Sequence, residues 1–445
     1  MKQKDKTSRH GLTAVHLIGA ARLAAVFAVT LLLLWLLLLL SATIPNAAIR
    51  ENMERSALSY RDRPGYEFAQ ENQFNTIADH YADVIWLNVA WNVGEGEPLS
   101  GSLCTNYYDG GDMGEAYGLF QTVTEGTAPN TDYTRYWHGT VIFLRLFHLF
   151  TDVEGVKLIG FCALLLLILL SCALLTKRGH GDLALLLLLS LAAVRFWNLR
   201  LSVEYQPSFL VAFAMLPLFL LWERRNDRAL TVLSTIAGTA VAFFDFLTTE
   251  TVTILLPLML VIAVRAKEGR LGAMRDDLLL LLRCGAAWGL SYVAAFPVKW
   301  AAAGAVSGAG VFSTALASVG ERIGGVKDFT EPPDSFLSAP LSNLNMLFGG
   351  PARVNYAQIL IGCGLALLLL LSVWYLLRGK EKQTQAAILL LMLGALVLLR
   401  YLVLNNHSYL HCFFTYRALV SLIFALTASV LLNIRRPKPK KERRS

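Results

Sequence analysis

The stretch "LIGAARLAAVFAVTLLLLWLLLLLSA", Leu17–Ala42, decides the fold class of this chain. Its 26 residues contain one charged side chain, Arg22, and about 20 apolar residues are enough for a helix to cross the hydrocarbon core of a bilayer. Several similar runs follow along the 445 residues, of which 55% are hydrophobic and 16% charged. The composition predicts an all-α polytopic membrane protein and excludes an ordinary soluble domain.

The start of the chain favours a membrane anchor. Residues 1–16 form a basic N-terminus that includes Lys2 and Arg9. The apolar run that follows is longer than the apolar region of a signal peptide, which has about 7–15 residues. We therefore expect an uncleaved signal anchor, while "IPNAA" at Ile44–Ala48 keeps cleavage open as an alternative.

Hydropathy predicts about ten transmembrane helices. The expected spans are 17–42, 156–176, 182–198, 206–222, 229–247, 249–265, 278–299, 357–377, 386–404 and 414–433. They divide the chain into the N-terminus 1–16, the first span 17–42, a large loop 43–155, spans two to seven within 156–299, a second loop 300–356, the last three spans within 357–433 and a basic tail 434–445.

The basic residues set the expected orientation. Loops such as "TKRGHG" and "WERRNDR" fall on the same side as the basic start and tail. The positive-inside rule then places both termini in the cytoplasm and the loops 43–155 and 300–356 outside the cell membrane. Because the net charge of +8 is gathered in these short segments, we do not expect a nucleic-acid partner.

The first outer loop is acidic, with fourteen acidic residues against five arginines between Arg50 and Arg135, a net charge of −9. Within it, "EFAQENQFNTIADHYADVIWLNVAWN" lacks Pro and Gly and predicts one amphipathic helix over 67–92. Asp79 and Asp83 are four residues apart and would share a face of that helix. A neighbouring like charge raises the pKa of a carboxyl, so they are the candidate catalytic pair for general-base chemistry.

A second helix is expected before the second span, in "TRYWHGTVIFLRLFHLFTDVEGVKL" from Thr134. His138, Arg145, His148 and Asp152 would form one polar stripe on an otherwise apolar helix. Such a helix lies along the membrane surface, and we expect the stripe to face a charged headgroup substrate. The alternative is an anchor whose cations touch lipid phosphates.

Basic side chains at the outer ends of spans run against the positive-inside rule and need an explanation. Arginine binds phosphate oxygens through two parallel hydrogen bonds, which suits an anionic lipid substrate. The alternative is that each arginine reaches toward water or pairs with a nearby acid. The candidate substrate-binding residues are Arg135, Tyr136, Trp137, His138, Arg195, Arg200, Glu204, His407, Tyr409, His411 and Arg417.

The last four residues of that set lie in "LNNHSYLHCFFTYRAL", Leu404–Leu419, between the ninth and tenth expected spans. This segment combines imidazole, hydroxyl and aromatic groups at one membrane face, a mixture suited to stacking a sugar and holding a phosphate. An interfacial aromatic belt is the alternative interpretation.

Three further features leave alternatives open. Asp109, Asp112 and Glu115 lie in a turn-rich stretch that could bind a divalent metal or be a solvated loop. Cys104 and Cys412 fall on the outer side, where a disulfide between them is one option. The small-residue segment from Ala301 to Gly325 could be a mobile lid or a passive loop.

The long first outer loop, its aspartates and the element "RYWHGTVIFLRLFHLF" before the second span resemble the GT-C superfamily of polytopic membrane glycosyltransferases. The likeness covers about residues 15–250, and within the superfamily it is to bacterial envelope proteins with "YAD" and "YWHG" segments. Members commonly have two prolines after the histidine of this element, where this chain has Gly139 and Thr140.

The resemblance implies transfer of a sugar from a polyprenyl-phosphate donor to an envelope glycan, lipid or protein acceptor on the outer face, with inversion at the sugar carbon and no organic cofactor. It implies Asp83 as the base, with Asp79 second. A lipid-linked sugar transporter or flippase is the alternative, because charges within spans, such as Glu250 and Arg400, also mark transport pathways. The concentration of extramembrane mass in one early loop, without an internal repeat, favours the enzyme.

Overall fold

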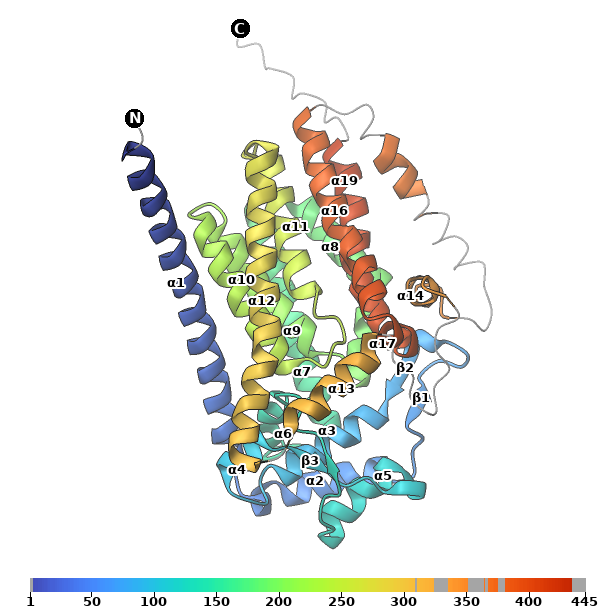
Figure 1. Cartoon of the computed structure of the whole chain (residues 1–445). Helices are drawn as coiled ribbons and strands as arrows, with labels where there is room; N and C mark the ends of the chain where they lie inside the picture. The colour runs from blue at the N-terminus through green and yellow to red at the C-terminus, as the bar shows by residue number, and fades with distance from the viewer. Residues whose placement is uncertain are drawn as a thin grey trace.

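The computed structural model describes residues 3–308, 310–323, 335–350, 364, 367–374 and 381–433. One layer is a bundle of roughly aligned helices (Figure 1). The bundle helices are α1 (Gln3–Ala42), α7 (Val153–Lys177), α8 (Gly181–Ala193), α9 (Pro207–Trp222), α10 (Asp227–Phe244), α11 (Val252–Lys267), α12 (Met274–Ser307), α16 (Glu381–Val403) and α19 (Leu419–Asn433). The start of α1 and the end of α19 lie at the same end of the bundle.

A second layer covers the opposite end of the bundle (Figure 1). It contains α2 (Asn46–Tyr60), α3 (His80–Asn92), α4 (Pro98–Leu103), α5 (Gly114–Phe120), α6 (Val141–Phe147) and the two-stranded pairs β1 (Tyr66–Phe68) with β2 (Ile77–Asp79) and β3 (Asn106–Tyr107) with β4 (Thr131–Asp132). The remaining short helices include α13 (Val311–Ile323), α14 (Ser338–Met346), α17 (Asn405–Leu410), α18 (Cys412–Thr415) and η4 (Phe196–Leu201). We call the second layer the loop layer.

The described helices confirm a mostly helical protein with candidate membrane-spanning segments. Six stretches are long and apolar enough to cross a bilayer: Ile18–Ala42, Val153–Lys177, Asp227–Phe244, Met274–Ser307, Thr384–Val403 and Cys412–Asn433. The expected spans at 182–198, 206–222 and 249–265 correspond to shorter helices of 13, 16 and 16 residues. The expected span 357–377 lies largely outside the described residues, so the count of ten and the assignment of sides stay predictions.

The centre of the bundle is α11, in which every residue from Val252 to Arg265 is buried. Before it, the chain leaves the helical conformation between α10 and α11. Non-helical backbone inside a membrane protein requires internal partners, and Arg400 of α16 provides them. Its guanidinium pairs with Glu250 at 2.9 and 3.1 Å and donates to the Leu247 carbonyl oxygen. This arginine therefore fixes the loop between α10 and α11 against α16.

The loop layer differs from the helix expected over 67–92. That prediction is wrong before residue 80, because a hairpin of β1 and β2 precedes α3. Asn72 at the hairpin turn adopts a left-handed conformation with φ of 59°, which an asparagine tolerates better than most residues. Asp79 then caps α3 by accepting a hydrogen bond from the Ala82 backbone N–H at 2.8 Å. The helix consequently begins at His80.

The prediction of one polar stripe along a long helix is also wrong. Only Val141–Phe147 is helical, and His138 has a left-handed φ of 56°, so the helix does not extend back to it. Arg145 is buried and donates to the Ser41 carbonyl oxygen at 2.9 Å and to Asn46 Oδ1 at 3.0 Å. His148 is buried beside Ser56, with Nε2 3.0 Å from Oγ. These side chains join α6 to neighbouring elements and do not face a headgroup.

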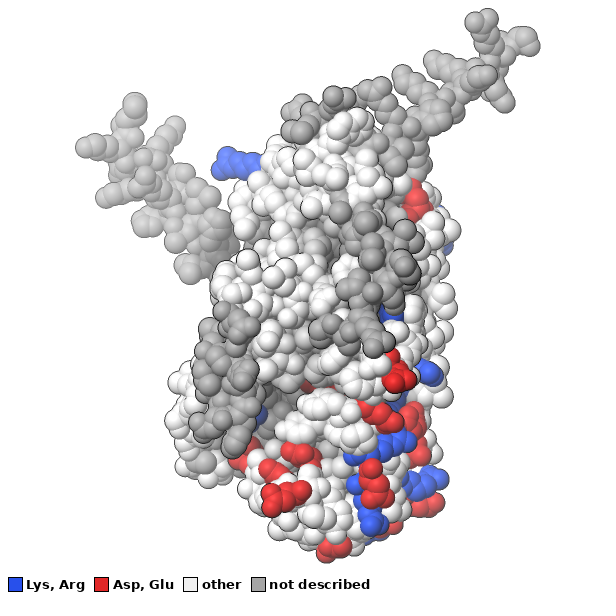
Figure 2. All heavy atoms as spheres, turned by 90° about the vertical axis from the view of Figure 1, so that its right-hand side faces the viewer, with Lys and Arg blue, Asp and Glu red and all other residues white. Residues whose placement is uncertain are grey.

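The distribution of charged side chains on the surface follows the same division into layers. On the face shown in Figure 2, charged side chains gather over the lower part of the molecule, while the helical part above them carries few. Cys104 and Cys412, the pair considered for a disulfide, are both free thiols. The segment considered as a lid continues α12 to Ser307 and forms α13, which packs against α17; residues 324 and 325 lie outside the described part.

Candidate functional site

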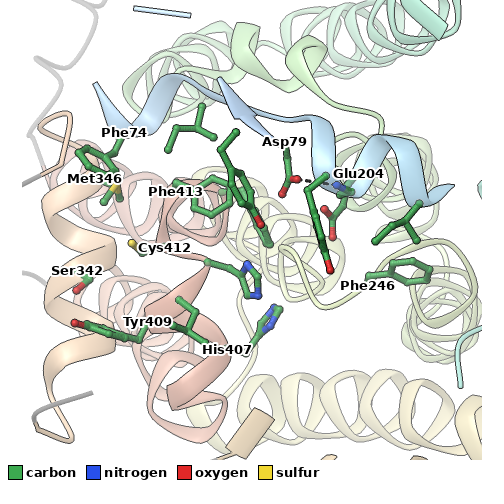
Figure 3. Close-up of a pocket in the computed structure, with 18 of the residues that line it drawn as sticks. Phe74, Asp79, Glu204, Phe246, Ser342, Met346, His407, Tyr409, Cys412 and Phe413 are labelled. Carbon is green, nitrogen blue, oxygen red and sulfur yellow. Dashed lines mark hydrogen bonds between the residues drawn. The ribbon is translucent and has the colours of Figure 1, made fainter. Parts of the chain in front are cut away.

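A cavity of about 950 Å³ lies where the loop layer meets the end of the bundle. Figure 3 shows Asp79 and Glu204 pointing into it from one side and His407 from the opposite side. The β1–β2 hairpin, the start of α3 and the segment before α6 supply one part of the wall. The other part comes from α14, α17 and α18, more than 200 residues later in the chain.

The cavity brings together six of the thirteen residues singled out in the sequence. They are Asp79, Arg135, Glu204, His407, Tyr409 and His411. Two of these residues are carboxylic acids, one is an arginine and two are histidines. The lining therefore combines groups that can accept a proton with groups that can bind an anion.

The hairpin explains why Asp79 reaches the cavity. Asp79 is the last residue of β2, where it is paired in register with Tyr66 of β1, and it is also the cap of α3. One carboxylate oxygen, Oδ1, is held by the Ala82 N–H, and the side chain points into the cavity (Figure 3). Only 2% of the residue is exposed. The backbone thus holds this carboxylate in a single orientation.

The environment of Asp79 favours its neutral form. Burial raises the pKa of its carboxyl to about 7, and the nearby negative charge of Asp83 acts in the same direction, against the opposing hydrogen bond from Ala82. A carboxyl with a pKa near 7 can both hold and release a proton at neutral pH. These properties suit a general base.

Asp83, the residue first implied as the base, does not line the cavity. Its exposed surface is 0%, and both of its oxygens already accept hydrogen bonds. Oδ2 accepts from the Tyr60 hydroxyl at 2.7 Å, while Oδ1 accepts from the Ser202 hydroxyl at 2.6 Å and the Val203 N–H at 2.7 Å. Lys157 Nζ lies 3.8 Å away. This carboxylate joins α3 to α2, α7 and the segment between η4 and α9.

Three basic side chains line the cavity: His407 and His411 from the α17 part of the wall and Arg135 from the segment before α6. The rings of His407 and His411 have centroids 4.7 Å apart, and Nε2 of His407 lies 3.0 Å from the Leu247 carbonyl oxygen. The loop fixed by Arg400 therefore also positions His407. Arg135 is half-buried, with its guanidinium carbon 4.4 Å from the centroid of the Tyr133 ring. Its donors can reach an anion in the cavity.

Aromatic rings make up much of the remaining wall, and sequence reasoning missed most of them. They are Tyr66, Phe68, Phe74, Tyr81, Trp86, Tyr107, Tyr133, Phe246, Tyr409, Phe413 and Phe414. Tyr66 and Tyr81 are stacked with centroids 6.1 Å apart. Flat apolar faces with polar tips suit a ligand that has both C–H faces and hydroxyl groups, such as a sugar.

Three candidate binding residues are structural in this fold. Tyr136 is buried, with its ring centroid 4.5 Å from that of Phe246. Trp137 donates its indole N–H to the Ala295 carbonyl oxygen at 2.8 Å. His138 is fully buried with Nε2 2.7 Å from the Tyr133 carbonyl oxygen, and burial lowers its pKa well below the usual value. All three hold the segment before α6 against the bundle.

The remaining candidate arginines lie apart from the cavity. Arg195 donates to the side-chain oxygens of Gln73 at 2.6 Å and Gln70 at 3.2 Å. Arg417 is buried between aromatic rings, with its guanidinium carbon 4.3 Å from the Tyr205 ring centroid. Arg200 lines a second, smaller cavity.

The acidic stretch considered for metal binding forms an ordered turn. The Asp109 carboxylate accepts a hydrogen bond from the Gly111 N–H at 2.9 Å, so it caps its own loop. Within the described ranges, no group of three or more His, Cys, Asp or Glu side chains is arranged to hold a metal ion.

Comparisons of the chain with models of known protein families, with curated proteins and with solved structures found no match.

The raised pKa of Asp79 predicts a pH-dependent effect of Asp79→Asn. Between pH 3.8 and about 7 the folded protein keeps a proton that the unfolded chain has released, so this group stabilises the fold at low pH and that contribution is lost as pH rises toward 7. Asparagine retains the capping oxygen and does not titrate. In detergent, the thermal unfolding midpoint of Asp79→Asn should therefore rise relative to that of the wild type between about pH 5 and about pH 8.

Taking the difference between variant and wild type cancels the contribution of the buried histidines, whose lowered pKa values give the opposite pH dependence. A difference that stays constant over this range would show that Asp79 is ionised throughout.

Replacement of Asp83 should instead damage the fold. Asp83→Ala leaves the Val203 N–H and the Tyr60 hydroxyl without their acceptor, and each buried donor left unpaired costs about 1–3 kcal/mol. We expect a clearly lower unfolding midpoint in detergent. Asp62→Ala is the matched control, because that side chain is 89% exposed. Equal midpoints for the two variants would contradict the structural role of Asp83.

Proposed function

We propose that the chain is an inverting membrane glycosyltransferase that moves a sugar from a polyprenyl-phosphate donor to an envelope glycan, lipid or protein acceptor. The observation that carries the proposal is the position of Asp79 in the cavity between the layers. A buried carboxyl with a pKa of about 7 there lies opposite His407 (Figure 3), and His411 and Arg135 line the same cavity.

In the proposed reaction, the ionised Asp79 accepts the proton of an acceptor hydroxyl as its oxygen attacks the anomeric carbon of the sugar. The bond between that carbon and the phosphate oxygen breaks, and the phosphate leaves with the bonding electrons. Attack from the side opposite the leaving group inverts the anomeric carbon. Atoms and charges balance, because the proton remains on Asp79 and the polyprenyl phosphate carries the negative charge.

The basic side chains of the cavity have a matching role. Negative charge grows on the phosphate oxygen as the bond breaks, and donors placed beside it stabilise the transition state more than the ground state. Arg135 is suited to this because its planar fork donates to two oxygens at once. His411 can add a ring N–H donor, whereas Nε2 of His407 lies against the Leu247 carbonyl oxygen. The aromatic wall would hold the sugar by stacking.

Asp79 replaces Asp83 as the proposed base for a structural reason. Both oxygens of Asp83 accept hydrogen bonds from donors in the protein interior, and the residue is fully buried. A base must come within hydrogen-bond reach of the substrate hydroxyl. Asp83 acts indirectly, because its charge contributes to the raised pKa of Asp79.

The charges that suggested a transporter have another explanation in this fold. Arg400 and Glu250 form a bidentate pair, and Asp245 accepts hydrogen bonds from Thr248. Together they hold the loop between α10 and α11, which borders the cavity through Phe246. Packing therefore accounts for these buried charges, and the transferase is the function that the site supports best.

The proposal predicts the loss of one envelope glycan modification. In a strain lacking the gene, mass spectrometry of envelope glycans should show that modification absent, restored by the wild-type gene and by Asp62→Asn, but not by Asp79→Asn. Removal of a general base lowers the rate by about 10²–10⁴-fold. Full restoration by an Asp79→Asn protein that reaches wild-type abundance in the membrane would refute the role of Asp79.

A further inference from the structure

A second cavity of about 490 Å³ lies on the other side of the β1–β2 hairpin. Successive side chains of a strand point to opposite faces, and this alternation separates the two cavities. Ile77 and Asp79 line the first, whereas Ala78 and His80 line the second together with Glu67. The hairpin is therefore the wall between the candidate catalytic cavity and a space that the proposed reaction does not use.

Around this second cavity the acidic residues have ion-pair partners, but two of the arginines do not. Its two acids have local partners: Glu154 lies 2.6 Å from Lys157 Nζ, and Glu67 lies 3.7 Å from His80 Nε2. Two further lining residues, Arg63 and Arg200, are exposed, and neither forms an ion pair with any described residue. The cavity thus presents two arginines that have no carboxylate partner within the described chain.

The position of the cavity indicates what would meet these arginines. It includes Lys157 and Leu158 in the first two turns of α7, a helix long and apolar enough to cross the membrane. Leu158 is 56% exposed, and the exposed apolar surface of α7 continues from it through Leu166 and Leu169. Leu201 adds a second apolar side chain to the lining. Cations and lipid-facing leucines therefore meet at the end of a spanning helix.

We propose that this second cavity binds the phosphate of an anionic membrane phospholipid, held between Arg63 and Arg200, with an acyl chain lying along Leu158 of α7. A guanidinium group can donate hydrogen bonds to two phosphate oxygens at once. Basic side chains next to the membrane surface also attract anionic headgroups. A soluble phosphate shares the charge but would gain nothing from the apolar end of the cavity. The lipid is therefore the expected ligand.

This site does not depend on the proposed transferase reaction, and its test needs no turnover. Native mass spectrometry of the purified full-length protein would follow binding of phosphatidylglycerol and of phosphatidylcholine with the same acyl chains. Wild type should prefer phosphatidylglycerol by at least about tenfold, as expected for two arginines at a lipid phosphate. Inorganic phosphate and glycerol phosphate are the soluble competitors. At concentrations similar to that of the lipid, neither should displace phosphatidylglycerol from the protein.

The double variant Arg63→Ala with Arg200→Ala should lose this preference. The matched control is Arg50→Ala with Arg61→Ala, which removes two arginines of the loop layer that do not line the cavity. The control should keep the preference of the wild type. A preference that survives in the first double variant, that is lost equally in the control, or that soluble phosphate abolishes would overturn the proposal.

Discussion

The arrangement of the whole molecule depends on the buried carboxylate of Asp83. It accepts hydrogen bonds from Tyr60 of α2 and from Ser202 just before α9, and it lies 3.8 Å from Lys157 of α7. One side chain of the loop layer is therefore bound to three elements, two of which belong to the bundle or lead into it. Because a buried ion pair requires its full set of hydrogen bonds, the loop layer has one favourable position on the bundle. That position places Asp79, four residues earlier, in the cavity between the layers.

A second constraint comes from the bilayer, in which backbone polar groups must find partners within the protein. The seven residues between α10 and α11 satisfy it through Arg400, which binds Glu250 and the Leu247 carbonyl oxygen. The same carbonyl lies 3.0 Å from His407. The non-helical loop thus positions His407, and a buried charged side chain holds each of the two parts of the wall that carry Asp79 and His407.

The sequence was sufficient for the six long apolar helices and for six residues of the cavity, because polar side chains at the ends of helices and in the adjoining loops can meet. It was insufficient for the hairpin: three-residue strands leave too short an alternation to compete with helical spacing over 67–92, and only the left-handed turn at Asn72 and the cap at Asp79 stop the helix. It also could not separate Asp79 from Asp83. Their different roles arise from partners such as Ser202, which is 119 positions away from Asp83.

The central claim is that Asp79 accepts a proton during sugar transfer from a polyprenyl phosphate. The most direct measurement reconstitutes the purified protein with lipid extract from a strain lacking the gene and follows lipid-linked sugars by mass spectrometry. The wild-type protein should consume one polyprenyl-phosphate sugar and release polyprenyl phosphate, while folded Asp79→Asn protein should leave that sugar donor intact. Consumption at equal rates by both proteins, or movement of an intact lipid-linked sugar across the bilayer, would contradict the account.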